Sequence, residues 1–599
     1  MRKVLVKISS LVLAVLVLCT GLVGCDLESI LSGIVNGSSG TGESNLPAVS
    51  VPEVAISMDG VAVWSKVDNA IYYIYVIDDG EENLTTECSV QLKNNQAIKV
   101  KAIGGEGYAD SDFSAPKTYI KTGEIEQGHT HTDVNSDNLC DVCGNKLTVE
   151  LSFYAVNDLH GKFMDTTGQP GVDEFTTYLK NLYADDSREE IVLSSGDMWQ
   201  GTVESSSNKG QLMTEWMNEV GFVSMTLGNH EYDWGAGALT PNSEQANFPF
   251  LAINVRQNGS EVDYCQASTI VEKAGVKVGI IGAIGDCLSS ISGDFTKGLS
   301  FSTGNILTSL VKSEATRLRS EEDCDFIVYS IHDGGSDFSP SGINSVTNSD
   351  MSWYDSSLSN GYVDLVFEAH THQRYILQDE YGVYHMQGGG ENKYISCAEV
   401  SFNTVTNKYS VNPRLIGSGE YASSSITGDP VVEEIFKQYF PDSNPYTTVL
   451  GTNRTKRWSS DICDKVAELY FNKGIEVWGK QYDIVLGGGY LKTRNPYDVA
   501  AGNVTYADLF SILPFDNEIV LGKISGKYLK SQFLAGKDNY HIYTNLTSSQ
   551  VSDSKDYYII VDSYSSTYYY NHITEIARLD SGTYARDLLA QFVKSGGWA

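Results

Sequence analysis

Two patterns of hydrophobic and polar positions divide the chain. Between residues 49 and 122, short runs such as 61–64, 70–76 and 97–102 alternate apolar with polar side chains and are separated by turn residues. This pattern predicts the strands of a small antiparallel sandwich. From Thr148 onward, apolar runs alternate with helical segments, which is the pattern of a layered α/β fold.

We expect two α/β regions in this longer part of the chain. The first, residues 148–418, is predicted to be a layered α/β sandwich, and the second, residues 446–599, a further α/β domain. The predicted fold class is therefore α/β and multi-domain, with the β-sandwich of residues 49–122 in front. That sandwich resembles a fibronectin type III module, on the basis of Trp64 and the 70–76 run.

The first 24 residues predict export. Arg2 and Lys3 precede an apolar run, 8–18, which is too short for a comfortable membrane span. Leu22-Val23-Gly24-Cys25 resembles a bacterial lipobox, which implies a lipidated Cys25 and an extracytoplasmic protein anchored to the bacterial cell membrane. A plain signal peptide with an incidental cysteine is the alternative. Residues 25–48, rich in Gly and Ser, are expected to form a flexible tether.

Composition excludes some classes of function. Hydrophobic residues make up 41% of the 599 residues, which argues against global disorder. The net charge of -34 argues against a nucleic-acid polymer as partner, because such surfaces need clustered Lys and Arg. An acidic protein that binds an anionic small molecule needs local positive charge, and bound cations supply it.

Residues 123–147 form a short insert rich in His, Cys and Asp. Four of its side chains could supply tetrahedral zinc ligands, namely His129, His131, Cys140 and Cys143. Its acidic and amide side chains are also compatible with an oxygen-rich calcium loop. A polar hinge with a disulfide between the two cysteines is the third possibility.

Five apolar runs of the first α/β region end in polar residues of one kind. These endings are Asn157-Asp158-Leu159-His160, Gly196-Asp197, Gly228-Asn229-His230-Glu231-Tyr232-Asp233, His332-Asp333 and Ala369-His370-Thr371-His372. Because the carboxyl ends of parallel strands share one edge of a sheet, we expect these side chains to converge. Carboxylate, amide and imidazole groups without a thiol favour Mn, Zn, Fe, Ca or Mg. Two such ions can activate a bound water and clamp both oxygens of a phosphoryl transfer.

The order of these motifs resembles the calcineurin-like metallophosphoesterases, and Asn-Asp-Leu-His-Gly and Leu-Gly-Asn-His-Glu resemble their 5'-nucleotidase branch. The resemblance implies two divalent metal ions. One set of ligands would be Asp158, His160 and His372, the other Asn229, His332 and His370, with Asp197 bridging. It also implies that His230 contacts the phosphate and that Asp233 orients it. Ala369 departs from the glycine that the family prefers there.

Residues 483–533 resemble the C-terminal substrate domain of 5'-nucleotidases, which supplies arginines and aromatic rings to the substrate. The family's Gly-Gly-Gly-Ile-Arg is replaced here by Gly487-Gly488-Gly489-Tyr490-Leu491, and no Gly-Gly-Asp-Gly follows near the end. The candidate substrate residues are therefore Arg494, Arg457, Tyr568 and Tyr569. Packing of the two tyrosines, rather than stacking on a base, is an equal alternative.

These observations predict a surface-anchored hydrolase that removes phosphate from small-molecule esters. A nucleotide is the expected substrate, and attack by metal-bound water is the expected reaction. A 2',3'-cyclic-nucleotide phosphodiesterase or a nucleotide-sugar hydrolase would use the same metal ligands. A surface binding protein that has lost catalysis is the alternative from another class.

Overall fold

The structure is a computed structural model of the 599-residue chain, which divides into two compact units, Met1–Lys121 and Thr122–Ala599. Within residues 46–599 it describes all but 58–59, 79, 94–95, 106, 120–132, 135–137, 142–143, 145, 165–170, 185–186, 336–353, 423–425, 442–443, 495–497, 537–539, 569–571 and 580–581. The predicted signal peptide, the lipidated Cys25 and most of the tether lie outside the described residues. In the described part, no helix is long and apolar enough to cross a membrane.

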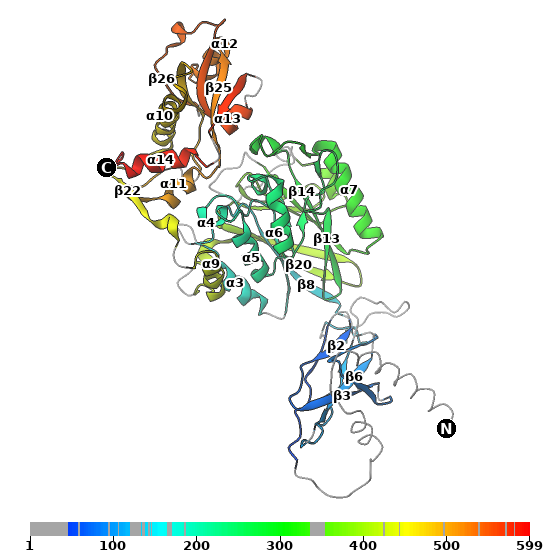
Figure 1. The fold of residues 1–599 in the computed structure, drawn as a ribbon. Coiled ribbons are helices and arrows are strands. Elements are labelled where there is room, and N and C mark those ends of the chain that lie inside the picture. Colours follow the sequence, from blue (N-terminus) through cyan, green and yellow to red (C-terminus); the bar gives the residue numbers. More distant parts are fainter. Residues whose placement is uncertain are drawn as a thin grey trace, which may run out of the picture. The chain divides into compact units, whose positions relative to one another are not determined.

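The first unit contains two antiparallel sheets (blue in Figure 1). One has the order β1-β2-β5 and the other β4-β3-β6-β7. Their bounds are β1 Val54–Ile56, β2 Val61–Trp64, β3 Ala70–Ile77, β4 Asn83–Thr85, β5 Ser89–Gln91, β6 Ala97–Gly104 and β7 Lys117–Thr118. Both sheets contribute to one core, where the rings of Trp64 and Tyr73 meet edge to face with centroids 5.6 Å apart. This arrangement is a small β-sandwich, and its likeness to a fibronectin module stays a prediction.

In the described part of the 123–147 insert, polar side chains bind the local backbone. Asp133 accepts a hydrogen bond from the Asn138 amide at 2.9 Å, and Asp141 accepts one from the Val134 amide at 2.9 Å. Of the four predicted zinc ligands, the buried Cys140 is described, whereas His129, His131 and Cys143 lie outside the described residues.

The second unit opens with two six-stranded mixed sheets packed face to face. Their orders are β11-β10-β9-β8-β20-β21 and β13-β14-β16-β17-β19-β18. In the first sheet the bounds are β8 Thr148–Val156, β9 Glu189–Ser194, β10 Ser224–Thr226, β11 Phe250–Leu251, β20 Tyr394–Asn403 and β21 Lys408–Gly417. In the second they are β13 Ser268–Lys273, β14 Val276–Ile284, β16 Phe326–His332, β17 Leu365–Phe367, β18 Arg374–Gln378 and β19 Tyr384–Gly388.

Continuous apolar runs form the central strands because both faces of each sheet are buried. Between the sheets, Phe153 of β8 stacks on Phe326 of β16 with centroids 5.6 Å apart. Helices α3 (Asp173–Tyr183) and α5 (Gln211–Val220) cover the outer face of the first sheet, and α7 (Gly304–Ser320) that of the second (Figure 1). The predicted layered α/β sandwich is confirmed.

This core continues past the expected boundary at residue 418. Helices α8 (Ser418–Tyr421) and α9 (Pro430–Tyr439) bury Tyr421, Val432 and Ile435 in the same cluster as α3 and α5. The apolar stripe of α9 explains the difference, because a surface helix of this kind must bury one face.

The C-terminal domain has a five-stranded sheet of order β26-β23-β27-β25-β28. The bounds are β23 Ile484–Tyr490, β25 Ile519–Ser525, β26 Tyr540–Thr544, β27 Asp556–Asp562 and β28 Ile573–Arg578. The helix α10 (Ser459–Trp478) packs on β23 and buries Cys463, Val466 and Tyr470 (Figure 1). The prediction of a second α/β domain is therefore confirmed as well.

Candidate active site

The five predicted strand ends meet at one edge of the two packed sheets. Asp158 and His160 follow β8, Asp197 follows β9, and Asn229 with His230 follows β10. From the second sheet, His332 closes β16, while His370 and His372 follow β17. The site is therefore shared between the sheets, and the buried apolar strands behind it fix where each loop starts.

Strained backbone marks these loops. Five of the seven predicted metal ligands adopt the left-handed region, with φ of 49° at Asp158, 52° at His160, 56° at Asp197, 68° at His370 and 54° at His372. Such conformations are uncommon for residues other than glycine and cluster at functional sites. Close packing adds a constraint, since a Cβ at Gly196, whose φ is 97°, would lie 2.7 Å from His332 Nδ1.

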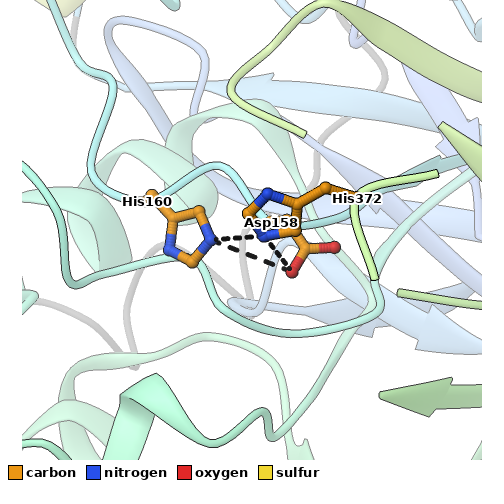
Figure 2. A group of neighbouring side chains, drawn as sticks. All are labelled: Asp158, His160 and His372. Carbon is orange, nitrogen blue, oxygen red and sulfur yellow. Dashed lines mark hydrogen bonds and ion pairs between the residues drawn. The ribbon is translucent and has the colours of Figure 1, made fainter. Parts of the chain in front are cut away.

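Asp158, His160 and His372 form one group that could hold a metal ion (Figure 2). The Nε2 atoms of the two histidines are 3.0 Å apart, and His372 Nε2 lies 3.3 Å from Asp158 Oδ1. Asp158 and His160 are buried, while the His372 side chain is 40% exposed, so the group opens to solvent on one side. Its donor set of one carboxylate and two imidazoles suits a borderline or hard divalent cation.

Asp197, His332 and His370 form the second such group. Asp197 Oδ2 lies 3.2 Å from His332 Nε2, and the rings of His332 and His370 are 5.2 Å apart. Asn229 joins them, with Oδ1 3.2 Å from His332 Nε2, whereas its buried Nδ2 has no partner among the described residues. The two groups are in contact, because the His370 amide donates to Asp158 Oδ2 at 2.9 Å.

Backbone carbonyls fix the tautomers of two histidines. His160 Nδ1 lies 3.0 Å from the carbonyl of Gln200, and His332 Nδ1 lies 2.8 Å from that of Ser195. Donation from Nδ1–H leaves Nε2 with its lone pair toward the ligand group, which is how metal-binding histidines are oriented. The residues present thus fit two divalent metal ions.

Burial and charge shift the titration of these groups. Burial and the positive charge of Arg494 lower the pKa of His160. Burial and the charge of the neighbouring His332 lower the pKa of His370 to about 4. Against burial, Asp197 raises the pKa of His332 to about 10. Also against burial, His332 and His230 hold the pKa of Asp197 well below its usual range. Because metal ligands bind deprotonated, metal uptake at His332 releases a proton.

His230 lies beside both groups without belonging to either. Its Nδ1 is 2.6 Å from Asp233 Oδ2, and its backbone amide donates to Asp197 Oδ1 at 2.9 Å. One face of its ring stacks on Phe515 of the C-terminal domain, with centroids 5.7 Å apart. The carboxylate of Asp233 therefore orients the imidazole of His230, so that Nε2 of the same ring faces the cavity.

Glu231 has a positioning role that the sequence did not reveal. Its buried carboxylate accepts hydrogen bonds from the amides of Asp197 at 2.9 Å, Met198 at 2.8 Å and Gly228 at 2.7 Å. Burial, with the charge of Asp197, raises its pKa to about 7. One side chain thus joins the loop after β9 to the loop after β10. Its place in Gly-Asn-His-Glu was the signal that could have identified it.

Arg494 reaches the metal-binding groups from the C-terminal domain. Its Nη1 donates to Gln200 Oε1 at 2.6 Å, and its Nη2 lies 2.6 Å from His160 Nε2. The guanidinium is also 3.5 Å from His230 Nε2. A fixed cation beside two metal sites is suited to bind an anionic group, because guanidinium matches the geometry of phosphate oxygens.

A cavity of about 330 Å³ extends from His230 and Arg494 into the C-terminal domain. Its aromatic lining includes Phe515, Tyr490 and Tyr564. None of these three was a candidate from the sequence, because they come from a strand, a helix and a loop with no common spacing. Tyr564 lies on α13 (Ser563–Tyr568), four residues before the predicted Tyr568.

The remaining predicted substrate residues lie elsewhere or are not described. The Arg457 Nε donates to Asn453 Oδ1 at 3.2 Å, and its guanidinium lies 5.9 Å from the ring of Trp598. Neither contact belongs to the cavity lining. The side chain of Tyr568 and all of Tyr569 lie outside the described residues.

Comparisons with known proteins agree with this geometry. Residues 151–374 match the calcineurin-like phosphoesterase family, and residues 480–571 match the 5'-nucleotidase C-terminal domain. Protein UshA from Yersinia enterocolitica is 23% identical over 432 residues, covering 64% of this chain and 76% of that protein. The snake venom 5'-nucleotidase of Gloydius brevicauda is 38% identical over 148 residues, 22% of this chain and 25% of that one.

A solved structure has the same fold. The 5'-nucleotidase precursor from Thermus thermophilus superposes with a TM-score of 0.55 at 16% identity, covering 75% of this chain and 96% of that one. Together, the fold and the site define a metal-dependent phosphoester hydrolase. More narrowly, the chain resembles the 5'-nucleotidases, because residues that match the calcineurin-like phosphoesterase family and residues that match the 5'-nucleotidase C-terminal domain occur in one chain.

Proposed function

We propose that this enzyme hydrolyses the phosphate ester of nucleoside 5'-monophosphates. The observation that carries the proposal is one continuous cavity with a phosphate end and an aromatic end. Arg494 and His230 line it beside the metal-binding groups, and Phe515, Tyr490 and Tyr564 line it within the C-terminal domain. Aromatic rings stack on nucleobases and contribute about 1–3 kcal/mol per base.

Asp158, His160 and His372 would hold one metal ion, and Asn229, His332 and His370 the other, with Asp197 between them. When bound, the two ions supply an activated water and positive charge for the transferring phosphoryl group. The chain's own residues bind and orient the ester. Arg494 clamps the phosphate oxygens, and Asp233 holds the imidazole of His230 where it stabilises charge on the phosphate and leaving oxygen.

Replacing Arg494 by alanine should lower kcat/KM for AMP by about ten- to hundredfold, because hydrogen bonds to a charged group contribute about 1.5–3 kcal/mol. Lysine should restore only part of the loss, since it lacks the two-pronged geometry. The measurement is steady-state phosphate release. Arg188→Ala, near the Glu399 carboxylate at 3.9 Å, is the matched control and should keep full activity. Equal kinetics for Arg494→Ala and wild type would contradict the clamp.

The function itself is tested with residues 26–599, which lack the signal peptide and Cys25. The protein is stripped of metal, and Mn²⁺, Zn²⁺ or Ca²⁺ is added back. Phosphate release is then followed with AMP, 2',3'-cyclic AMP, UDP-glucose and an aryl phosphate. We expect metal-dependent turnover with AMP preferred. A preference for the cyclic or sugar nucleotide would reject the monophosphate assignment, whereas turnover of the aryl phosphate alone would reject nucleotides altogether.

We further propose that the enzyme works at the bacterial surface, held by lipid on Cys25. The support is the order of basic start, short apolar run and Leu-Val-Gly-Cys in the sequence. Palmitate labelling of cells that express the full chain should mark the wild type and not Cys25→Ser. Labelling of both would point to another attachment site.

A further inference from the structure

Two buried polar side chains interrupt the apolar wall of the cavity in the C-terminal domain. This wall contains Cys463, Val466 and Tyr470, which are spaced along one face of α10. It also contains Asp562, the last residue of β27. Neither Tyr470 nor Asp562 belongs to the metal-binding groups.

The hydroxyl of Tyr470 is left without a well-formed hydrogen bond. Tyr470 is fully buried, and its Oη forms no hydrogen bond of acceptable geometry in the described part of the chain. The carboxyl of Asp562 is its polar neighbour, and burial together with the charge of this carboxyl raises the pKa of the phenol. A buried hydroxyl left unsatisfied costs about 1–3 kcal/mol. Such a group beside a cavity is explained if the occupant of the cavity completes its bonding.

The carboxyl of Asp562 is buried beside Tyr470, with no ion pair to a cation among the described residues. Asp562 is 5% exposed, and its Oδ1 accepts a hydrogen bond from the backbone amide of Ser565 at 2.6 Å. Burial raises its pKa, and Ser565 and Tyr470, neither of them charged, are the neighbours that oppose the shift. Burying an unpaired carboxyl is costly, so a function for the group is expected.

We propose that Tyr470 and Asp562 form a subsite that reads the hydrogen-bonding edge of the nucleobase. Asp562 accepts a hydrogen bond from an exocyclic amino group, and the Tyr470 hydroxyl donates to the adjacent ring nitrogen. The inference rests on the proposed function and narrows it to nucleotides whose base carries an amino group next to a ring nitrogen, as adenine does. A keto oxygen in place of the amino group would face the carboxyl oxygen and be rejected.

The expected preference for an amino group over a keto oxygen depends on the cost of leaving the buried polar groups of the subsite unpaired. A binding site that accepts a hydrogen bond from the substrate discriminates strongly against an analogue without that donor, because a buried acceptor is then left unpaired. This discrimination is larger than that of an apolar pocket against an analogue that lacks one methylene group. We therefore expect wild-type kcat/KM for AMP to exceed that for IMP by at least about tenfold.

The test compares three variants on AMP, IMP and an aryl phosphate with the metal-loaded protein. In Asp562→Asn the side-chain carbonyl can still accept the Ser565 amide, while its NH₂ group now favours a keto oxygen. The AMP-to-IMP ratio of kcat/KM should therefore fall about tenfold or invert. In Tyr470→Phe, the ratio of AMP to aryl phosphate should fall about three- to tenfold.

Tyr183→Phe is the matched control, because its buried hydroxyl likewise lacks a partner among the described residues but does not line the cavity. It should keep all three rates. Failure of the wild type to turn over AMP would overturn both the function and the subsite. Turnover of AMP with no preference over IMP, or ratios unchanged in Asp562→Asn and Tyr470→Phe, would overturn the subsite alone. The aryl phosphate rate, which needs no base, reports whether each variant is folded.

Discussion

Asp197→Ala should lower kcat for phosphate release by at least about a thousandfold, because the bridging position contributes several kcal/mol to a two-metal site. Two divalent cations about 3.5–4 Å apart repel each other, and a carboxylate between them offsets that repulsion. In this chain, Asp197 Oδ2 lies 3.2 Å from Nε2 of His332 in the second group. The Asp197 carbonyl accepts a hydrogen bond at 3.0 Å from the amide of His160, which belongs to the first group. Turnover is measured at saturating Mn²⁺, and bound metal by mass spectrometry.

The control for Asp197 is Asp364→Ala, which removes a comparably buried carboxylate from the same domain. Asp364 accepts hydrogen bonds from Arg319 at 2.5 Å and from the Ile327 amide at 2.7 Å, far along β16 from its catalytic end. This variant should lose stability and keep its kcat once folded. More than a tenth of wild-type activity in Asp197→Ala would contradict the bridging role.

The catalytic edge could be predicted from the sequence because each ligand directly follows an apolar strand. Asp158, Asp197 and His370 sit within a few residues of β8, β9 and β17, and strand direction alone brings them to one edge. Arg494 could be proposed for a different reason, because it is one of the first basic residues after Gly487-Gly488-Gly489, where the 5'-nucleotidase pattern has an arginine. The resemblance to these two families, the fold class and the phosphoester chemistry depended on these local signals and are confirmed.

The substrate end could not be predicted, because its residues meet only through tertiary packing. Tyr470 comes from a helix, Tyr490 from the end of β23 and Phe515 from a loop, with no shared period. The dense run of tyrosines at 568–570 pointed instead to residues beyond Tyr564. The packing of α9 on α5 could not be predicted for a related reason, since no local signal in the sequence indicates it.

A buried hydrogen-bond network behind the loop that carries His370 and His372 also could not be predicted from the sequence, because its residues meet only in the folded structure. His385 is fully buried, with Nδ1 2.7 Å from Glu368 Oε1 and Nε2 3.4 Å from Asp379 Oδ2. The register of β18 and β19, which pairs Leu377 with His385, places Asp379 nearby, and Glu368 directly follows β17. Tyr375 donates a second hydrogen bond to Glu368, which immediately precedes the His370 loop. Against burial, Asp379 and Glu368 raise the pKa of His385, which favours the charged imidazole between the two carboxyl groups. Burial also raises the pKa of Glu368, although His385 opposes that shift.

His385→Leu should therefore lower the free energy of unfolding by about 3–5 kcal/mol, because it leaves two buried carboxylates without their cation. Urea unfolding followed by fluorescence measures the change. His541→Leu is the matched control, since His541 Nδ1 also lies 2.7 Å from a carboxylate, that of Asp464, whose side chain is 68% exposed. A pair exposed to solvent contributes about 0–1 kcal/mol. Adding Glu368→Gln to His385→Leu should recover part of the loss, because one of the stranded charges is then removed. Equal losses in the two histidine variants would show that His385 acts only by filling space.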